Sequence, residues 1–349
     1  MNGDVRILLI GGTGFIGSYV TRDLVKQHHQ VAVFQRGRSP AEIKYRIERI
    51  NGDRNELARW EREIKDFAPD VVVDFILSSE RQAAAAMKLF RRIASRFVAL
   101  SSADVYRAIA VLHGLDQGPL QEVPLTEDSE LRNAPPYGEE ALKSVKKVYP
   151  WVDDEYDKIP VEAAVLSDAE LPGTVLRLPM VYGPGDPLHR LHPYLKRMDD
   201  HRPAILLEAQ AAQWRGPRGY VENVAAAIAL AAASDRATGR IYNVAEPDAL
   251  SEQEWVEAVA RAANWRASIR VLPAELMPPH LATPYNSAQH WTVSSGRIRK
   301  ELGYAEPVSS PIALERTIEW ERKHRPLQVD PNQFDYAAED AALQAHSSI

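Results

Sequence analysis

A buried strand that ends in closely spaced glycines constrains this chain more than any other feature of its sequence. Residues 5–10 (VRILLI) form a continuous apolar run, which is typical of a parallel strand buried on both faces. Apolar residues then recur at helical spacing from residue 15 onward. In such a turn one glycine permits the bend, a second lets the backbone approach a diphosphate, and a third lets helix and strand pack closely. Because amides and the positive end of the helix dipole bind phosphate there, the turn predicts a dinucleotide site formed by Gly11, Thr13, Gly14, Phe15, Ile16 and Gly17.

Strands and helices alternate along the rest of the chain, which is the pattern of crossover units on a parallel sheet. We expect strands at 31–34, 47–53, 71–76, 97–101, 174–182, 205–207 and 241–244. Helices are expected at 56–67, 81–94, 155–170, 188–199, 222–232, 252–263 and 312–325. The predicted fold class is α/β, with a Rossmann-type doubly wound parallel sheet and a smaller C-terminal α/β substrate lobe.

The same pattern divides the chain into three expected parts. Residues 1–183 are expected to form the dinucleotide-binding Rossmann core, in which 107–150 is an irregular, proline-containing excursion over the site. Residues 184–326 are expected to form a substrate-binding lobe that is interleaved with the core. Residues 327–349 are polar and alanine-rich, and we expect a loose tail there.

Composition excludes several classes of function. The 42 lysines and arginines are outnumbered by 48 aspartates and glutamates, so no basic surplus favours nucleic acid or an anionic membrane. The absence of cysteine excludes disulfides, thiolate nucleophiles and cysteine-bound zinc. No apolar run is long enough for a membrane span, and the N-terminus is interpreted as the first strand and not as a signal peptide. We therefore expect a cytoplasmic protein without nucleic-acid or membrane partners.

The end of the second predicted strand indicates which dinucleotide binds. An NAD-binding protein usually places an acidic residue there, about 20 residues beyond the glycines, for the ribose 2′-hydroxyl. This chain has Arg36 and Arg38 instead, and guanidinium groups suit a 2′-phosphate. NADP is thus the expected cofactor ahead of NAD, the alternative being a solvated basic loop. Asp53, after the third strand, is expected to accept a hydrogen bond from the adenine amino group.

The motifs together resemble the extended short-chain dehydrogenase/reductase superfamily, in its NAD-dependent epimerase/dehydratase branch. The resemblance runs from about residue 5 to about residue 325. It rests on GGTGFIG at 11–17, GDRNE at 52–56, ALSSADVY at 99–106, YDKIPVE at 156–162, LRLPMVYGPGD at 176–186, RGYVENVA at 218–225, YNVAE at 242–246 and RKELGY at 299–304. It implies hydride transfer between the nicotinamide cofactor and a hydroxyl or carbonyl carbon.

The resemblance also implies catalytic residues. Ser102, with Ser101 beside it, matches the residue that hydrogen-bonds the reacting oxygen; a serine that merely caps the strand end is the alternative. Lys158 matches the lysine that binds the nicotinamide ribose and lowers the pKa of a catalytic tyrosine four residues earlier. Glu162 follows at the family interval, but the position four residues before Lys158 is Asp154.

The tyrosine of this chain is displaced. Tyr156 precedes Lys158 by two residues, and on a regular helix these side chains would point about 200° apart. Tyr156 can still serve if an aspartate caps the helix and the tyrosine lies in a distorted first turn. The alternatives are that Asp154 acts as the base, that Tyr137 or Tyr149 reaches in from the excursion, or that the standard chemistry is lost.

Further residues are implied on the substrate side. Pro179 and Met180 match the segment beside the nicotinamide, and Arg215 and Arg218 fall where sugar-nucleotide members bind the pyrophosphate. Arg190 is a candidate for an anionic substrate. The neighbouring His189 and His192 suggest either an anion site or a metal site, but no acidic cluster joins them, so we expect surface residues and no metal.

Two functions follow. The first is an NAD(P)-dependent oxidoreductase or epimerase that acts on a small polar substrate, a nucleotide sugar being one candidate. The second is a dinucleotide-binding sensor or regulatory protein that has lost the tyrosine–lysine chemistry. A homodimer is an alternative to a monomer.

Overall fold

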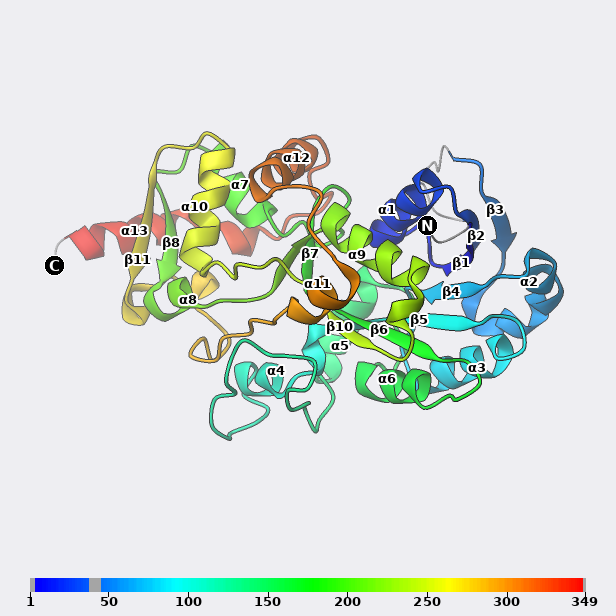
Figure 1. The fold of residues 1–349 in the computed structure, drawn as a ribbon. Coiled ribbons are helices and arrows are strands. Elements are labelled where there is room, and N and C mark those ends of the chain that lie inside the picture. Colours follow the sequence, from blue (N-terminus) through cyan, green and yellow to red (C-terminus); the bar gives the residue numbers. More distant parts are fainter. Residues whose placement is uncertain (1–3, 38–44, 348–349) are drawn as a thin grey trace.

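A computed structural model describes residues 4–37 and 45–347, and its centre is a seven-stranded parallel sheet (Figure 1). The strand order is β10-β6-β5-β4-β1-β2-β3, and each neighbouring pair is parallel. The strands are β1 (Arg6–Ile10), β2 (Gln30–Gln35), β3 (Glu48–Asn51), β4 (Val71–Asp74), β5 (Arg96–Ser102), β6 (Gly173–Leu178) and β10 (Ile241–Asn243). This confirms the predicted α/β class.

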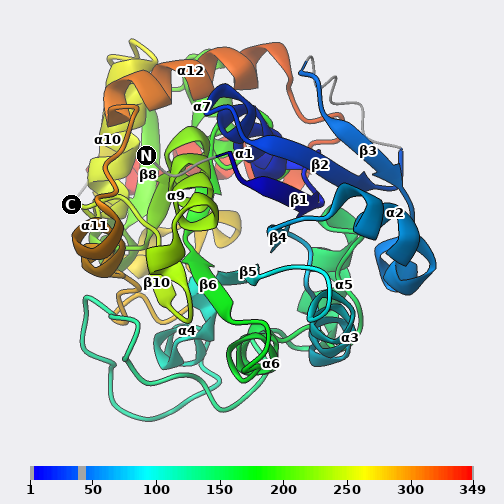
Figure 2. The ribbon, with the colours of Figure 1, turned by 45° about the vertical axis from the view of Figure 1, so that its right-hand side comes forward.

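Helices cover both faces of the sheet, because its strands carry apolar side chains on both sides. On one face lie α1 (Phe15–Lys26) and α9 (Val221–Ala233), and on the other α2 (Glu61–Phe67), α3 (Glu80–Phe90) and α6 (Lys158–Leu166) (Figure 2). The chain runs from β1 outward to β3 and then returns to β4 on the other side of β1. Ligands of doubly wound sheets bind at such a reversal, beyond the carboxyl ends of the strands.

The second lobe is built on small parallel sheets. β8 (Ala204–Glu208) pairs with β11 (Ser268–Leu272), and β7 (Met180–Tyr182) pairs with β9 (Arg218–Tyr220). The helices α7 (His192–Asp199), α8 (Ala209–Gln213), α10 (Glu252–Ala262) and α12 (Ser310–Lys323) pack in this half, whereas α11 (Gly296–Leu302) packs against β10 and α9. None of the helices within residues 4–37 and 45–347 has the length and apolar character that a membrane crossing requires.

Two of the differences between predicted and observed element boundaries bear on the site. The expected strand 174–182 divides into β6 and β7 at Pro179, which has no N–H to continue a ladder, and β7 leaves the central sheet to pair with β9. The expected helix 155–170 begins only at Lys158. Its N-cap is Asp157, whose carboxylate accepts from the Ile159 amide at 3.0 Å. Tyr156 therefore precedes the helix.

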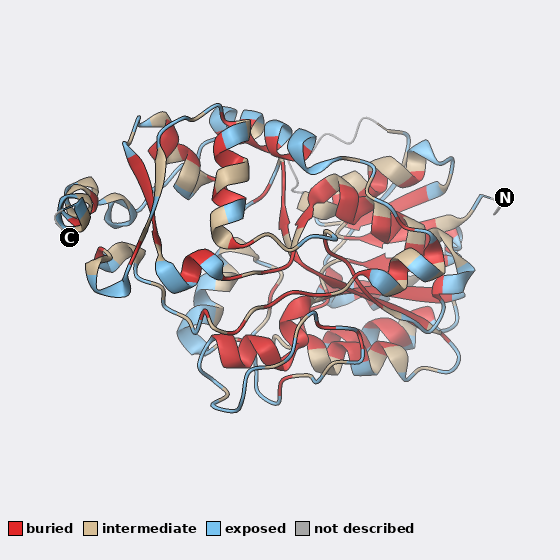
Figure 3. Ribbon diagram, turned by 60° about the vertical axis from the view of Figure 1, so that its left-hand side comes forward, coloured by how far each residue is buried: buried red, intermediate tan, exposed pale blue. Residues whose placement is uncertain are grey.

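The excursion at 107–150 holds two short helices that differ in burial. Every residue of α4 (Arg107–Leu112) is buried (Figure 3). Ala108, Ile109 and Leu112 belong to a cluster with Trp291 and Val293. α5 (Glu139–Val148) has no buried residue. The segment between them, which has no regular helix or strand, accounts for the irregular sequence pattern.

The expectation of a loose tail at 327–349 is wrong for its described part, residues 327–347. This part contains a 3-10 turn at Pro331–Phe334 and α13 (Tyr336–Ser347), which lies at the far end of the second lobe (Figure 1). Glu339 of α13 is buried, and its carboxylate forms an ion pair with Arg197 of α7 at 2.6 Å. This alanine-rich segment is an ordered helix because its buried ion pair and the buried Ala342 anchor it to the second lobe.

Candidate functional site

One cavity of about 720 Å³ opens at the carboxyl ends of β1, β4, β5 and β6. This volume lies within the range of small-molecule sites, about 300–1,000 Å³. The glycine turn lines one end, and α5, the segment after it and the loop after β7 line the other. The residues that line it are Gly11, Gly14, Phe15, Ile16, Gly17, Phe75, Ile76, Leu100, Ser101, Ser102, Asp104, Tyr137, Ser144, Val145, Val148, Tyr149, Trp151, Val152, Tyr156, Lys158, Leu178, Pro179, Val181, Gly185, Pro187, Leu188 and Arg190.

The glycine turn has the geometry that a dinucleotide requires. Gly11 has a φ of +86°, which a residue with a side chain rarely adopts. A Cβ on Gly17 would lie 2.5 Å from the carbonyl oxygen of Gly11, so only glycine lets α1 pack against the turn. A Cβ on Gly14 would meet nothing closer than 3.4 Å, so the space beside this residue is open. The first turn of α1 carries no acidic residue, and a diphosphate therefore fits its N-terminus.

Of the residues predicted to bind the adenosine half, those that the structure describes lie outside the cavity lining. Arg36 follows β2 directly and is exposed, and Arg38 lies outside the described residues. Asp53 is exposed after β3, where its carboxylate accepts from the Asn55 amide at 2.8 Å and caps a 3-10 turn. Thr13 lies in the glycine turn and is partly buried.

Ser101 and Ser102, at the end of β5, have different environments. Both line the cavity, and the hydroxyl oxygen of Ser102 accepts from the Asp104 amide at 3.2 Å, so Ser102 also caps the 3-10 turn that follows the strand. Ser101 is buried, and its hydroxyl donates to Glu162 of α6. Glu162 is in turn held by Arg177 at 2.7 Å, within a buried polar network. Ser102 is therefore the serine available to a ligand.

Lys158 is buried beneath the cavity at the start of α6. Its ammonium donates to the carbonyl oxygens of Leu77 and Leu100, at the ends of neighbouring strands. Since an ammonium has three donors, one is left for a ligand. Burial lowers the pKa of Lys158 to about 8, against the opposing effect of the Asp104 and Asp74 carboxylates.

The structure brings Tyr156 into the cavity beside this lysine. The Lys158 ammonium lies 5.7 Å from the centre of the Tyr156 ring and 5.3 Å from that of Trp151. The ring of Tyr137 lies 5.8 Å from that of Tyr156. Burial, and then the nearby Asp104 carboxylate, raise the pKa of Tyr156 well above its ordinary value, opposite to the lowering by the lysine that the family resemblance implies. Asp154 is exposed, pairs with Lys146 and does not line the cavity, so the structure does not bring it to Ser102 and Lys158.

Asp104 is a site residue that the sequence reasoning missed. It is 5% exposed and lines the cavity, and its Oδ1 atom has no hydrogen-bond partner among the described residues. Burial raises the pKa of Asp104, opposed by the positive charges of Arg132 and Lys158. The signal was present in the motif SSADVY, as an acidic residue two positions after Ser102 at the end of a buried strand.

Only some of the residues predicted on the substrate side line the cavity. Pro179 and Arg190 line the cavity, whereas Met180 packs against the cluster that contains Trp214. Arg190 pairs with Asp186 at 2.6 Å and donates to the Val181 carbonyl oxygen at 2.7 Å.

The two arginines predicted to bind a pyrophosphate do not line the cavity. Arg215 pairs with Glu254 at 2.9 Å. Arg218 pairs with Glu252 at 2.5 Å, and its guanidinium lies over the Trp255 ring. Both guanidinium groups are therefore already matched by a carboxylate.

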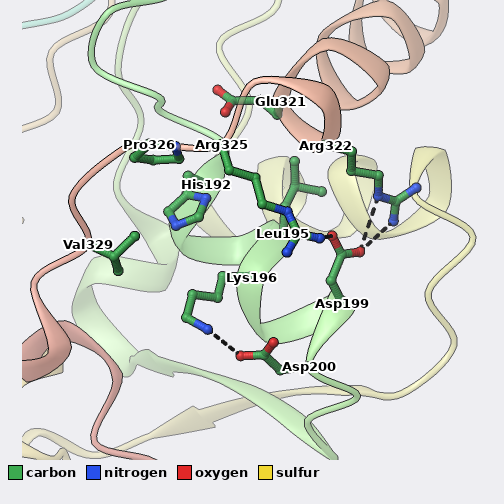
Figure 4. Close-up of a pocket in the computed structure, with 10 residues that line it drawn as sticks. All are labelled: His192, Leu195, Lys196, Asp199, Asp200, Glu321, Arg322, Arg325, Pro326 and Val329. Atoms are coloured by element: carbon green, nitrogen blue, oxygen red, sulfur yellow. Dashed lines mark hydrogen bonds and ion pairs between the residues drawn. The ribbon is translucent and has the colours of Figure 1, made fainter.

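The two histidines lie away from this cavity. His192 lines a separate pocket of about 150 Å³ between α7 and α12, with Lys196, Asp199 and Arg322 around it (Figure 4). His189 binds Glu321 at 2.8 Å and stacks on Trp320. Within residues 4–37 and 45–347, no group of three histidine or acidic side chains is placed to hold a metal ion.

Comparisons with known proteins point to one family. The sequence model of the NAD dependent epimerase/dehydratase family matches residues 7–245. The 2'-dehydrokanamycin reductase of Streptomyces kanamyceticus is 27% identical over 278 residues, which cover 78% of this chain and 70% of that protein.

Solved structures of low sequence identity share the fold. The Bordetella bronchiseptica enzyme WbmG in complex with NAD and UDP has a TM-score of 0.66 at 18% identity, covering 92% of this chain and 96% of that chain. The Thermus thermophilus UDP-glucose 4-epimerase in complex with NAD has a TM-score of 0.59 at 21% identity, covering 91% of this chain and 99% of that chain.

Proposed function

The chain belongs to the NAD dependent epimerase/dehydratase family, and from this membership we propose that it is an NADP-dependent reductase of a carbonyl group on a small polar, carbohydrate-like substrate. The observation that carries the proposal is the shared lining of one cavity by the glycine turn, Ser102, Tyr156 and Lys158. A binding protein without chemistry would not need a serine, a tyrosine and a lysine beside a dinucleotide site.

The glycine turn would hold the diphosphate of the cofactor, and the remaining donor of Lys158 would hold its nicotinamide ribose. When bound, the dinucleotide supplies or accepts the hydride. Ser102 donates a hydrogen bond to the reacting oxygen from the end of β5. Lys158 holds the Tyr156 ring in place, because its ammonium is fixed by two backbone carbonyls.

Tyr156 can act as the proton donor of a reduction. Its phenol is protonated at neutral pH, as that of an ordinary tyrosine is, and its hydroxyl would give a proton to the alkoxide oxygen that forms when the carbonyl carbon accepts the hydride. The curated relative from Streptomyces kanamyceticus is also named a reductase. The cofactor preference rests on Arg36, which is exposed directly after β2 where an NAD-binding protein would carry an acidic residue.

A spectroscopic assay tests this proposal. The purified protein is mixed with NADPH and a panel of keto-sugars, and oxidation of the nicotinamide is followed by absorbance. We expect turnover with at least one keto-sugar, and its loss in Ser102→Ala. Ser167→Ala, which changes an exposed serine after α6, serves as the matched control and should retain turnover. Unchanged turnover in Ser102→Ala would contradict the proposed role of this serine.

The second candidate is a protein that binds the dinucleotide without catalysis. The two-residue spacing of Tyr156 and Lys158 favours this candidate only if both residues lie on one helix, where their side chains would point apart. In the structure Tyr156 precedes the helix. The assay distinguishes the two, because a binding protein would bind NADPH and oxidise none of the panel.

A further inference from the structure

The segment that carries Tyr156 is not held in place by a helix. Tyr156 precedes α6, so the backbone hydrogen bonds of that helix do not fix the tyrosine relative to Lys158. Residues 153–157 contain no helix or strand. A proton donor must stay within hydrogen-bond reach of the oxygen that it serves. The position of this ring therefore depends on contacts that the residues around it make with other parts of the fold.

Both ends of the segment 153–157 are attached to the residues between β4 and α3. At one end the Asp153 carboxylate accepts from the hydroxyls of Ser78 and Ser79, at 3.1 and 2.7 Å. At the other end the Asp157 amide donates to the Ser78 carbonyl oxygen at 3.1 Å. These bonds attach the segment to the end of β4, but not to the end of β5, where Ser102 lies.

Arg132 attaches the same segment to the end of β5. This arginine belongs to the excursion between α4 and α5, and its side chain is 1% exposed. Its Nη2 donates to the Asp157 carboxylate at 2.6 Å, and its Nε donates to the Asp104 carbonyl oxygen at 2.9 Å. Its Nη1 donates to the Ala134 carbonyl oxygen at 2.5 Å, so each nitrogen of the guanidinium has a partner. Since the Asp104 amide donates to Ser102, one guanidinium joins the turn of the serine to the N-cap beside the tyrosine.

We propose that Arg132 is a positioning residue, which fixes Asp157 and thereby holds the Tyr156 ring in the cavity. This inference rests on the proposed function, since it concerns the proton donor of the same site. A guanidinium is planar and presents its donors in a fixed fork, so it sets the direction as well as the distance of its partners. Its charge has a second effect: burial raises the pKa of Tyr156, and Arg132 acts against that rise.

Two single variants and their combination test the link. Arg132→Gln removes the guanidinium, and Asp157→Asn keeps a residue that caps helices but removes the charge that Arg132 binds. Because Asp157→Asn leaves the Arg132 charge buried without a counter-charge, the double variant, which removes both charges, is measured as well. We expect each of the three to lower kcat about 10²-fold, with little change in KM for the keto-sugar or in NADP affinity. Wild-type kcat in the double variant would overturn the proposal.

A double-mutant cycle separates positioning of the tyrosine from a general loss of structure. In Tyr156→Phe the hydroxyl is absent, so displacing the ring leaves no proton transfer to impair. Arg132→Gln/Asp157→Asn should therefore change the residual turnover of Tyr156→Phe by less than about twofold. An equal loss in both backgrounds would show a merely structural role. Asp330→Asn, a matched change at the exposed cap of the turn Pro331–Phe334, should retain kcat in both.

NMR of protein labelled with ¹³C-tyrosine gives a readout that needs no turnover. The ring resonance of Tyr156 is identified by its loss in Tyr156→Phe, and its environment includes the Tyr137 ring and the Lys158 ammonium. We expect Arg132→Gln/Asp157→Asn to shift or broaden this resonance and Asp330→Asn to leave it unchanged. An unchanged resonance in the double variant would overturn the inference. The expected change, in a protein whose wild type oxidises no NADPH, would sustain the contact and overturn the proposed function alone.

Discussion

The ammonium of Lys158 lies 5.7 Å from the centre of the Tyr156 ring, although the two residues are separated by only one position. On a continuous helix this spacing would direct the side chains apart. The structure avoids that outcome because Asp157 is the N-cap and has extended backbone angles, so the chain direction changes between the two residues. A tyrosine two positions before the lysine can thus lie beside the lysine ammonium in the same cavity.

Removing the Tyr156 hydroxyl tests its role in proton transfer. Tyr156→Phe keeps the ring over Lys158, so the protein should fold and bind NADP normally while kcat falls by about 10²–10⁴-fold. Turnover measured at saturating NADPH and keto-sugar checks this. Tyr137→Phe and Asp154→Asn are the controls, and we expect each to retain most of the activity. If Tyr137→Phe abolishes turnover and Tyr156→Phe does not, the proton donor is Tyr137.

The lowered pKa of Lys158 predicts a pH dependence of stability. The folded protein releases this proton near pH 8, whereas the unfolded chain holds it up to about pH 10.4. Between these values the unfolded state binds more protons, so this group makes the free energy of unfolding rise with pH. Relative to Lys158→Met, the wild type should gain about 2 kcal/mol between pH 8 and pH 10. Urea unfolding at several pH values measures the difference, and a pH-independent difference would contradict the lowered pKa.

The sheet and the glycine turn could be predicted because the sequence patterns that indicate them are local. The apolar run before Gly11 and the glycine spacing are dictated by burial and by close backbone approach, and both lie within one short segment. The same holds for Ser102, which is the last residue of a buried strand. In the structure the glycine turn follows β1 and Ser102 ends β5, as the sequence pattern predicts, and their roles toward a cofactor and a substrate stay proposals.

The rest of the site depends on distant partners. The sequence does not reveal that Arg218 pairs with Glu252, 34 positions away, or that Glu162 binds Arg177. The orphaned oxygen of Asp104 is likewise a property of packing, since any aspartate near the surface would be hydrated. The helix of the C-terminal segment was missed because its composition resembles a tail and its anchor, Arg197, lies far earlier in the chain.

The buried pair of Glu162 and Arg177 should make a large contribution to stability. Glu162→Gln leaves the Arg177 charge buried without its counter-charge and weakens the bond from Ser101, so we expect a loss of about 3 kcal/mol. Urea denaturation provides the measurement. Glu140→Gln, on the exposed face of α5, should change the free energy of unfolding by less than about 0.5 kcal/mol. A similar small effect from Glu162→Gln would show that the network is dispensable.

The C-terminal helix should depend on Glu339. Replacing it by alanine leaves Arg197 without its buried partner, so α13 should detach more often from α7. Limited proteolysis within 327–335 reports the detachment, and we expect cleavage to accelerate about tenfold or more. Glu275→Ala, an exposed residue of the same lobe, is the control. Cleavage at the wild-type rate in Glu339→Ala would mean that the apolar contacts of α13 suffice.

Arg36 should set the preference between the two nicotinamide cofactors. Arg36→Ala removes the guanidinium proposed to pair with the 2′-phosphate, so NADP affinity should fall about tenfold while NAD affinity stays unchanged. Arg92→Ala, an exposed arginine after α3, should alter neither affinity. Equal losses for both cofactors would assign Arg36 to a group that NAD and NADP share.

Calorimetric titration of the wild-type protein with NADP, and separately with NAD, tests the central claim most directly. The open space beside Gly14 and the N-terminus of α1 predict one dinucleotide per chain, with NADP bound more tightly than NAD. If neither cofactor produces binding heat at any temperature at which the protein is folded, the glycine turn is not a dinucleotide site and the proposed chemistry has no basis.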